Sequence, residues 1–454
     1  MTEKIKVLKQ HFQTNPEWYW LLTVIFLFPL LPEYLSPFIL FAGFIVFIIN
    51  WKKIGNKALL GNTGKIFLIY MGYMVISGIW SKTHLLSSLI GLLWMGCFLI
   101  YVYIANTVNT KEKLKNAITL VNISAGIIGL IALLEIATYN LTKQFEWFNF
   151  TFPNPFYYNI NDIIYDAIPV EIVNNKYSSR ASSTFDNPLI LATYLVVTTP
   201  FCAFGSVYFK HSRNRKISRI CLALAIGGII STSSRSAYAA VAISIIVILI
   251  STGSKKVFNK IIPFVFILVT AYPFGLFLRY KNSSAGAFAK STERRFEIWK
   301  SCFDMFGKKP LVGYGAGTDN VHTMLRDNYA IDRTHAHNLL IEMLVEGGIV
   351  GIIFIAVITA VIVRNIYVMM KNQNKVFKSY AVLYNSSLLG FLTMSLFEFT
   401  LQSPKELMIF FLLLGFIEAT YRIATHTHQS SNINILTFGK NAAEENKKIK
   451  SHMI

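Results

Sequence analysis

Two histidines stand two residues apart in the segment 333–338 (RTHAHN), directly before a long apolar run. A neutral imidazole can accept a proton near neutral pH, so His337 is a candidate general base. Glu342 and Glu346 follow within the apolar run, and either carboxylate could orient the ring of His337. His335 should face elsewhere if a helix has already begun at these residues. The pattern therefore predicts proton-transfer chemistry centred on His337.

A metal site that uses His322, His335 and His337 is an alternative for the same part of the chain. Imidazole nitrogen is a common ligand of zinc and other transition metals. However, no cysteine and no tight carboxylate spacing supports such a site. A plainer alternative is that His337 only caps the helix that follows it. We therefore predict that the site uses no metal and no cofactor.

Arginines accompany three further polar clusters, and a guanidinium can bind a phosphate through two parallel hydrogen bonds. Arg180 comes shortly before an Asn-Pro pair that begins an apolar run, and Arg235 lies in a short serine-rich break between two runs. Arg294 and Arg295 precede Trp299, and a helix would place Arg295 and Trp299 on one face. Each arginine could instead reach the membrane surface, or its helix could lie on that surface. We predict that these arginines bind an anionic group.

These clusters belong to a chain of 454 residues that is 54% apolar and only 15% charged. Globular proteins carry about 25% charged residues. Apolar runs of about 20 residues, each long enough to cross a bilayer as a helix, recur from Trp18 to Arg422. A membrane β-barrel is excluded, because its strands would alternate apolar and polar residues. The net charge of +20 does not indicate nucleic-acid binding, since most charges lie in short loops between the apolar runs.

The composition therefore predicts an all-α integral membrane protein of about twelve transmembrane helices, with a large outer loop between the ninth and the tenth. An even number of spans places both termini on one side, and the basic N-terminus and tail favour the cytoplasm. Long outer segments translocate regardless of their charge. The predicted spans are 18–32, 35–50, 65–80, 86–104, 117–139, 188–209, 217–231, 236–252, 261–279, 338–363, 379–400 and 405–422.

This map places the polar clusters at the outer, extracytoplasmic face of the membrane, where sugar nucleotides and ATP are absent. It divides the chain into six regions: helices one to five in 1–139, a first long outer loop in 140–187, helices six to nine in 188–279, a large outer loop in 280–337 that carries candidate catalytic residues, helices ten to twelve in 338–422, and a basic cytoplasmic tail in 423–454.

Taken in order, the polar clusters resemble the O-antigen ligase and polymerase superfamily of bacterial envelope glycosyltransferases. The resemblance covers about residues 180–360 and implies a membrane fold of roughly twelve helices with a periplasmic site. The matching motifs are Arg180-x-x-x-Thr-Phe-x-Asn-Pro, Ser234-Arg235-Ser-Ala-Tyr, Arg295-x-x-x-Trp299, Pro310-Leu-x-Gly313-x-Gly315, His335-x-His337-Asn338 and Glu346-Gly-Gly-x-x-Gly351.

The resemblance implies that the donor is a saccharide on a polyprenyl (undecaprenyl) diphosphate carrier and that the acceptor is a sugar hydroxyl. Arg235 and Arg295 match the family's essential arginines and would stabilise charge on the diphosphate leaving group. His337 would take the proton of the acceptor, and attack from the far face would invert the anomeric centre. Arg180 and Arg294 would add diphosphate contacts, and His335, Asn338, Glu342 and Trp299 would support the site.

Two alternatives remain open within and beyond this family. A ligase transfers the glycan to the lipid A core, whereas a polymerase transfers it to another lipid-linked repeat unit, with the same chemistry. The set of Arg235, Arg295 and His337 favours the ligase. A polysaccharide transporter or flippase is the other class, but the chain shows no paired half-repeats and no charged pair in the middle of a span.

Overall fold

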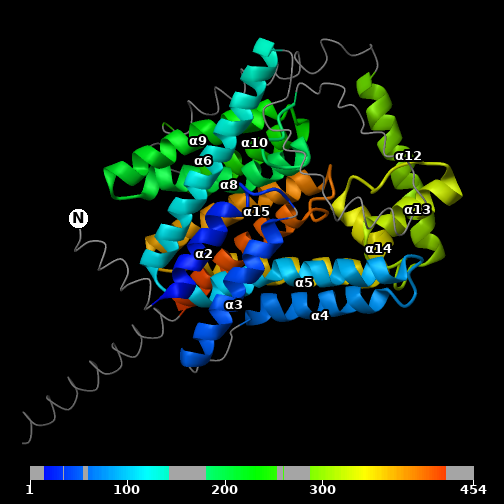
Figure 1. The fold of residues 1–454 in the computed structure, drawn as a ribbon, viewed down its shortest axis with the longest axis horizontal. Coiled ribbons are helices and arrows are strands. Elements are labelled where there is room, and N and C mark those ends of the chain that lie inside the picture. The colour runs from blue at the N-terminus through cyan, green and yellow to red at the C-terminus, as the bar shows by residue number, and fades with distance from the viewer. Residues whose placement is uncertain are drawn as a thin grey trace, which may run out of the picture.

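The computed structural model describes residues 15–33, 35–54, 60–142, 180–252, 259 and 287–425. Within these ranges every regular element is a helix, which confirms the predicted all-helical fold for this part of the chain. Figure 1 shows the helices in order: α2 (Pro16–Leu27), α3 (Ser36–Ile54), α4 (Gly61–Ser77), α5 (His84–Thr107), α6 (Lys111–Thr142), α8 (Pro188–Tyr208), α9 (Ser212–Ser231), α10 (Arg235–Thr252), α12 (Ala287–Lys308), α13 (Thr318–Tyr329), α14 (Leu339–Met370), α15 (Lys375–Ser395) and the helix Pro404–Thr425.

Six of the described helices are long and apolar enough to cross a membrane, namely α5, α6, α8, α10, α14 and Pro404–Thr425. Every predicted span overlaps a described helix except 261–279, which lies outside the described residues. The multi-pass character expected from the composition is therefore supported, while the number of twelve spans stays a prediction.

Glycines allow the helices at the centre of the bundle to approach one another closely. A Cβ atom on Gly129 of α6 would lie 2.2 Å from the carbonyl oxygen of Leu224 in α9, and one on Gly228 would lie 2.8 Å from Cα of Gly129. Small residues at such crossings are typical of helices that pack inside a membrane. The helix Pro404–Thr425 and α8 are buried along most of their length, so the core of the bundle surrounds them.

The segment before α14, predicted as a large loop, contains α12 and α13. Both helices lie at one end of the molecule (Figure 1) and share a small apolar core with the start of α14. Asn320 of α13 is buried and joins this unit to α5 and to the turn between α4 and α5. Its Oδ1 accepts a hydrogen bond from the Ser81 hydroxyl at 2.8 Å, and its Nδ2 donates to Ser87 at 2.7 Å. These bonds fix the unit of α12 and α13 to the rest of the helical bundle.

Helix α14 is interrupted at Gly348, whose φ of 59° and ψ of −146° are not helical. The glycine-containing segment 310–315 fills the interruption. Tyr314 N–H donates to the Val345 carbonyl at 2.9 Å, and Ile349 N–H donates to the Pro310 carbonyl at 2.8 Å. A Cβ atom on Gly348 would lie 2.6 Å from the Leu311 carbonyl oxygen, so glycine is required here. Two of the predicted motifs therefore bind each other through their backbones.

Candidate active site at the start of α14

His337, Glu398 and Arg295 form a connected cluster from three separate parts of the chain. Nδ1 of His337 lies 3.0 Å from Oε2 of Glu398, and Nη2 of Arg295 donates to Oε1 of the same carboxylate at 2.8 Å. The carboxylate is 9% exposed, whereas the side chains of His337 and Arg295 are each 26% exposed. A charge pair that is largely withdrawn from solvent is stronger and more directional than one at the surface. The cluster therefore holds an accessible imidazole in one orientation.

The neighbours of His337 fix its position. Asn338 is the N-cap of α14, and its Oδ1 accepts hydrogen bonds from the backbone N–H groups of Leu340 and Ile341. Nδ2 of Asn338 also donates to the Leu396 carbonyl at 3.0 Å, which ties the start of α14 to the segment after α15. On the other side of His337, the indole N–H of Trp299 donates to the Ala336 carbonyl at 2.8 Å.

Glu342 completes this frame rather than orienting the imidazole. It is fully buried, and its Oε2 accepts a hydrogen bond from the backbone N–H of Ala336. The expectation that Glu342 or Glu346 would orient the His337 ring is therefore wrong, because Glu398 holds that ring instead. The supporting role predicted for Asn338, Glu342 and Trp299 stays a prediction. Glu342 and Trp299 each form a hydrogen bond with the backbone of residue 336, and Asn338 directly follows His337.

The backbone of His337 is strained. Its φ is 51°, in the left-handed region that residues with a side chain seldom adopt. Such a conformation costs about 1–3 kcal/mol and persists only where surrounding contacts determine it. The contacts of Asn338, Trp299 and Glu342 described above hold the backbone of His337 in this conformation. In this conformation Nδ1 of His337 lies 3.0 Å from Oε2 of Glu398.

His335 lies beside His337, contrary to the prediction that it faces elsewhere. The two rings have centroids 4.1 Å apart, and the backbone N–H of His337 donates to Nδ1 of His335 at 3.1 Å. The prediction was wrong because α14 begins at Leu339, so these residues do not follow helical periodicity. Burial, and then the neighbouring His337, lower the pKa of His335 to about 4. His335 is therefore neutral at physiological pH.

Glu398 is the residue of this site that the sequence prediction missed. It falls within the predicted span 379–400, but α15 ends at Ser395 and the chain then leaves the helix. An ionisable residue near the end of an apolar run was the signal that could have identified it.

Arg180 contacts the buried turn that precedes Arg235. Nε of Arg180 donates to the Thr232 carbonyl at 2.8 Å, and the backbone N–H of Ala181 donates to the Ser231 carbonyl at 2.9 Å. The segment that begins at Arg180 therefore packs on the turn that carries Arg235, which is the first residue of α10.

The packing of α10 on α15 relates the position of Arg235 to that of Glu398. Ser244 donates to the Ser386 carbonyl at 2.9 Å, and Thr252 shares a pocket with Ser379, so the two helices are antiparallel. The first residue of α10 and the last residue of α15 thus lie at the same end of the pair. Arg235 is therefore at the end of the bundle where Glu398 follows α15. Arg294, by contrast, is exposed next to Arg295 on α12.

The three groups His335, His337 and Glu398 could offer ligand atoms to a metal, since those atoms lie within 4.8 Å of one another. Among the described residues no such group includes His322, whose Nε2 instead lies 3.0 Å from Oδ1 of Asp332. Oε1 of Glu398 already accepts a hydrogen bond from Arg295, and Oε2 lies beside Nδ1 of His337. A metal ion would meet the guanidinium charge at short range, which is electrostatically unfavourable. The arrangement fits a hydrogen-bonded imidazole better than a metal ligand set.

Comparison with known proteins agrees with the resemblance noted in the sequence. Residues 220–356 match the family model described as O-antigen ligase, a range that includes Arg235, Arg295 and His337. The chain is also 25% identical over 230 residues to a protein of Acinetobacter baylyi named "ComP-specific O-oligosaccharyltransferase". That alignment covers 47% of this chain and 41% of the relative, so it spans less than half of either protein. With their polar motifs in the family order, residues 220–356 are therefore similar to the O-antigen ligase superfamily.

Proposed function

We propose that the protein is a membrane glycosyltransferase of the O-antigen ligase type. It transfers a saccharide from a polyprenyl (undecaprenyl) diphosphate carrier to a hydroxyl acceptor at the periplasmic face of the bacterial inner membrane, with both termini in the cytoplasm. The observation that carries the proposal is the cluster in which Glu398 holds both His337 and Arg295. The match of residues 220–356 to the ligase family supports the same reaction class.

His337 acts as the general base in this proposal. With Nδ1–H donating to Glu398, the second ring nitrogen is unprotonated and is available to the acceptor hydroxyl. The acceptor oxygen loses its proton to that nitrogen and forms a bond to the anomeric carbon. The bond from that carbon to the diphosphate oxygen breaks, and the diphosphate leaves with the electron pair. Attack from the far face inverts the anomeric centre.

Arg295 and Arg235 stabilise the negative charge on the departing diphosphate. Arg295 uses one terminal nitrogen for Glu398 and keeps further N–H donors of its guanidinium, which is partly exposed. Preorganised donors of this kind stabilise charge that develops in the transition state. Arg180 and Arg294 are proposed as additional donor contacts. Diphosphate is a good leaving group, so the mechanism needs no general acid, metal or sugar nucleotide.

The proposed reaction has three candidate acceptors. Lipid A core is the acceptor of a ligase in lipopolysaccharide synthesis, and a lipid-linked repeat unit is that of a polymerase. A third candidate is a protein hydroxyl, which the name of the Acinetobacter baylyi relative favours. These acceptors share one chemistry, in which His337 removes a hydroxyl proton.

Purified protein in detergent can test the reaction and its acceptor together. One lipid-diphosphate donor would be supplied with lipid A core, with a second lipid-linked unit, or with a protein that offers serine and threonine hydroxyls, and the product would be identified by mass spectrometry. We expect transfer to one of them and release of polyprenyl diphosphate. No consumption of donor with any acceptor would reject the proposed function. It would favour a transporter, whose activity requires a sealed membrane.

A further inference from the structure

Lys405 is a charged residue that lies completely inside the protein. It is 0% exposed, although it is only the second residue of the helix Pro404–Thr425. Its Nζ donates a hydrogen bond to the Thr184 carbonyl at 2.6 Å and to the Pro29 carbonyl at 3.3 Å. The same atom lies 4.1 Å from the centroid of the Phe185 ring. The proposed mechanism uses none of these residues, so the buried ammonium has no role in it.

The surroundings of the ammonium show that it does not bind the donor itself. Two carbonyl oxygens and one aromatic face account for its three N–H donors. A diphosphate does not reach a side chain that is 0% exposed. A buried charge is costly unless nearby groups compensate it, and Glu33 and Asp186 oppose the charge of Lys405. The ammonium therefore acts through the protein segments that it contacts.

On one side, Lys405 is closely connected to the carboxylate of the candidate active site. It follows Glu398 by only seven residues. The segment between them is internally bonded at its start, because Oγ of Ser395 lies 2.6 Å from Oγ1 of Thr400. Glu398 in turn holds the imidazole and the guanidinium described above. The position of the ammonium is thus related to that of the proposed general base.

On the other side, the ammonium contacts the segment 180–187, which leads to the turn before Arg235. The carbonyl of Thr184 in this segment accepts the shorter of its two hydrogen bonds. Four residues earlier, Nε of Arg180 donates to the Thr232 carbonyl at 2.8 Å. The ammonium therefore reaches the proposed diphosphate arginines through one packed segment.

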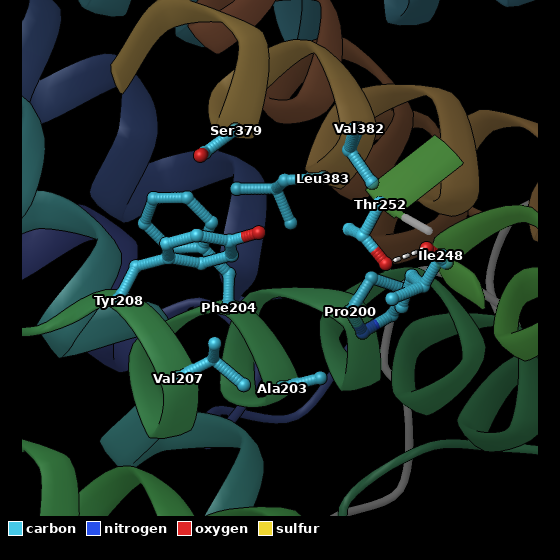
Figure 2. A pocket seen from close by; sticks show the side chains of 10 residues that line it. All are labelled: Pro200, Ala203, Phe204, Val207, Tyr208, Ile248, Thr252, Ser379, Val382 and Leu383. Carbon is cyan, nitrogen blue, oxygen red and sulfur yellow. Dashed lines mark hydrogen bonds between the residues drawn. The ribbon is translucent and has the colours of Figure 1, made fainter. Parts of the chain in front are cut away.

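Helix α10, which begins at Arg235, is the least buried of the six long apolar helices, with 28% of its residues buried. A pocket of about 400 Å³ lies between α8, α9 and α10, and one of about 290 Å³ lies between α8, α10 and α15. Figure 2 shows the side chains of α8, α10 and α15 around the smaller pocket. A helix with few buried contacts is held weakly along its length. The placement of Arg235 therefore depends on contacts at the start of α10.

We propose that Lys405 is a positioning residue for the transfer reaction. Its ammonium holds the segment 180–187, and with it Arg235, at a fixed distance from His337 and Arg295. The inference rests on the proposed function, in which both arginines must reach one diphosphate while the imidazole reaches the acceptor. A displacement of about 1 Å between such groups costs about 10²-fold in rate. Lysine suits the position, because a compact ammonium bonds to several groups around one point.

The kinetics of Lys405→Met and Lys405→Gln test the proposal in the purified full-length protein. Methionine fills a similar volume but donates to neither carbonyl, whereas glutamine keeps N–H donors on a slightly shorter side chain. With saturating donor and acceptor, we expect Lys405→Met to lower kcat by about 10–100-fold. Lys405→Gln should show a smaller loss. Thermal unfolding in detergent would be measured for each variant, so that kcat is compared between folded proteins.

Lys113→Met is the matched control. Nζ of Lys113 also donates to a backbone carbonyl, that of Thr107 at 3.2 Å, and lies 5.5 Å from the centroid of the Trp18 ring. Lys113 lies near the start of α6, whereas Glu135, near the end of this helix, accepts hydrogen bonds from the segment 180–187. These positions are about 33 Å apart at the helical rise of about 1.5 Å per residue. The kcat of Lys113→Met should stay within about twofold of the unmodified value.

A double-mutant cycle separates positioning from a general loss of stability. If Lys405 acts by placing Arg235, substitutions of the two residues remove the same contribution, and their effects are not additive. In an Arg235→Lys background, Lys405→Met should lower kcat further by less than about threefold. In a Lys300→Ala background it should cause its full loss of about 10–100-fold. A defect of folding would produce equal losses in both backgrounds.

The outcomes separate the role of Lys405 from the reaction itself. If the unmodified protein transfers glycan and both folded Lys405 variants keep its kcat, the positioning role is wrong while the proposed function stands. Additive losses in the cycle with Arg235→Lys would also overturn it. If Lys405→Met does not fold, Lys405→Gln decides by the same cycle, and failure of both to fold would show a purely structural role. If the unmodified protein transfers nothing, the proposed function fails, and the positioning role fails with it.

Discussion

Oε2 of Glu398 lies 3.0 Å from Nδ1 of His337, which joins the segment after α15 to the start of α14. The carboxylate stabilises one tautomer of the imidazole and the positive charge that the ring gains when it accepts a proton. Replacing the corresponding aspartate of a serine protease triad with asparagine lowers kcat by about 10⁴-fold. We therefore expect Glu398→Gln to lower kcat by about 10²–10⁴-fold, with a smaller loss for Glu398→Asp.

Steady-state kinetics with saturating donor would measure this effect. Glu297→Gln is the matched control, because Glu297 is exposed on α12 near Arg295. Its kcat should equal that of the unmodified protein. A Glu398→Gln variant that is folded and turns over at the normal rate would remove Glu398 from the mechanism.

Loss of either proposed diphosphate arginine should reduce transfer strongly. Removing one preorganised donor from a developing charge costs about 10²–10³-fold in rate. Arg235→Ala and Arg295→Ala should each show such a loss in kcat, and lysine should restore only part of it because the planar fork is missing. Lys300→Ala, on the exposed face of α12, is the control. Equal losses for Lys300→Ala and Arg295→Ala would indicate only a diffuse electrostatic effect.

The lowered pKa of His335 predicts a pH dependence of stability. Its pKa is about 4 in the folded protein, below the ordinary value of 6.5, because burial and His337 disfavour the charged ring. The unfolded chain therefore binds a proton at higher pH than the folded protein does. The resulting stabilisation is fully present above about pH 6.5 and is lost as pH falls toward 4.

Thermal unfolding in detergent between pH 7.5 and pH 4 would measure that loss. We expect His335→Asn to show a smaller decrease of Tm over this interval than the unmodified protein, because asparagine does not titrate. Identical pH profiles for the two proteins would contradict the assigned direction of the shift.

Metal removal should leave the activity unchanged. Both oxygens of Glu398 contact side chains, and one of these is the cationic Arg295. Purified protein would be treated with EDTA and assayed, and its metal content would be determined by mass spectrometry. Loss of turnover after EDTA, with recovery on adding zinc or magnesium, would show that His335, His337 and Glu398 hold a metal instead.

The interruption of α14 should be sensitive to any side chain at position 348. A Cβ atom there would lie 2.6 Å from the Leu311 carbonyl oxygen, and the positive φ of Gly348 adds strain. We expect Gly348→Ala to destabilise the protein by about 1–3 kcal/mol or more. Gly307→Ala in α12 is the control, because no atom lies within 4 Å of its added Cβ. Urea titration monitored by tryptophan fluorescence can compare the two. Equal midpoints would show that the contact between segment 310–315 and α14 is not required.

The sequence was sufficient to predict the helical class, the positions of most apolar helices and the resemblance to the ligase family. These features follow from local patterns, since a span is a continuous apolar run and each motif is a short string of residues. The small core shared by α12, α13 and α14 was not anticipated, because its residues are far apart in the chain.

The sequence predicted site residues only where the residue type alone indicates a chemical role. His337 and Arg295 were selected as a base and an anion ligand, and the structure places both on one carboxylate. Glu398 was hidden in an apolar run, because its function depends on where α15 ends. The direction of the His335 side chain depended on the backbone of residues 335–338, where His337 adopts a positive φ that periodicity does not describe.

The frame around His337 has a consequence for dissecting the protein. Trp299 of α12, Asn338 of α14 and Glu398 after α15 each contribute to one site. A contiguous fragment must therefore include residues 299–398 to contain the whole site. The unit 287–337, which contains α12 and α13, would carry the imidazole without its carboxylate if it were expressed alone. Such a fragment is a poor antigen or screening target for ligands of the assembled site. Chimaeras between relatives should exchange this unit and the end of α15 together.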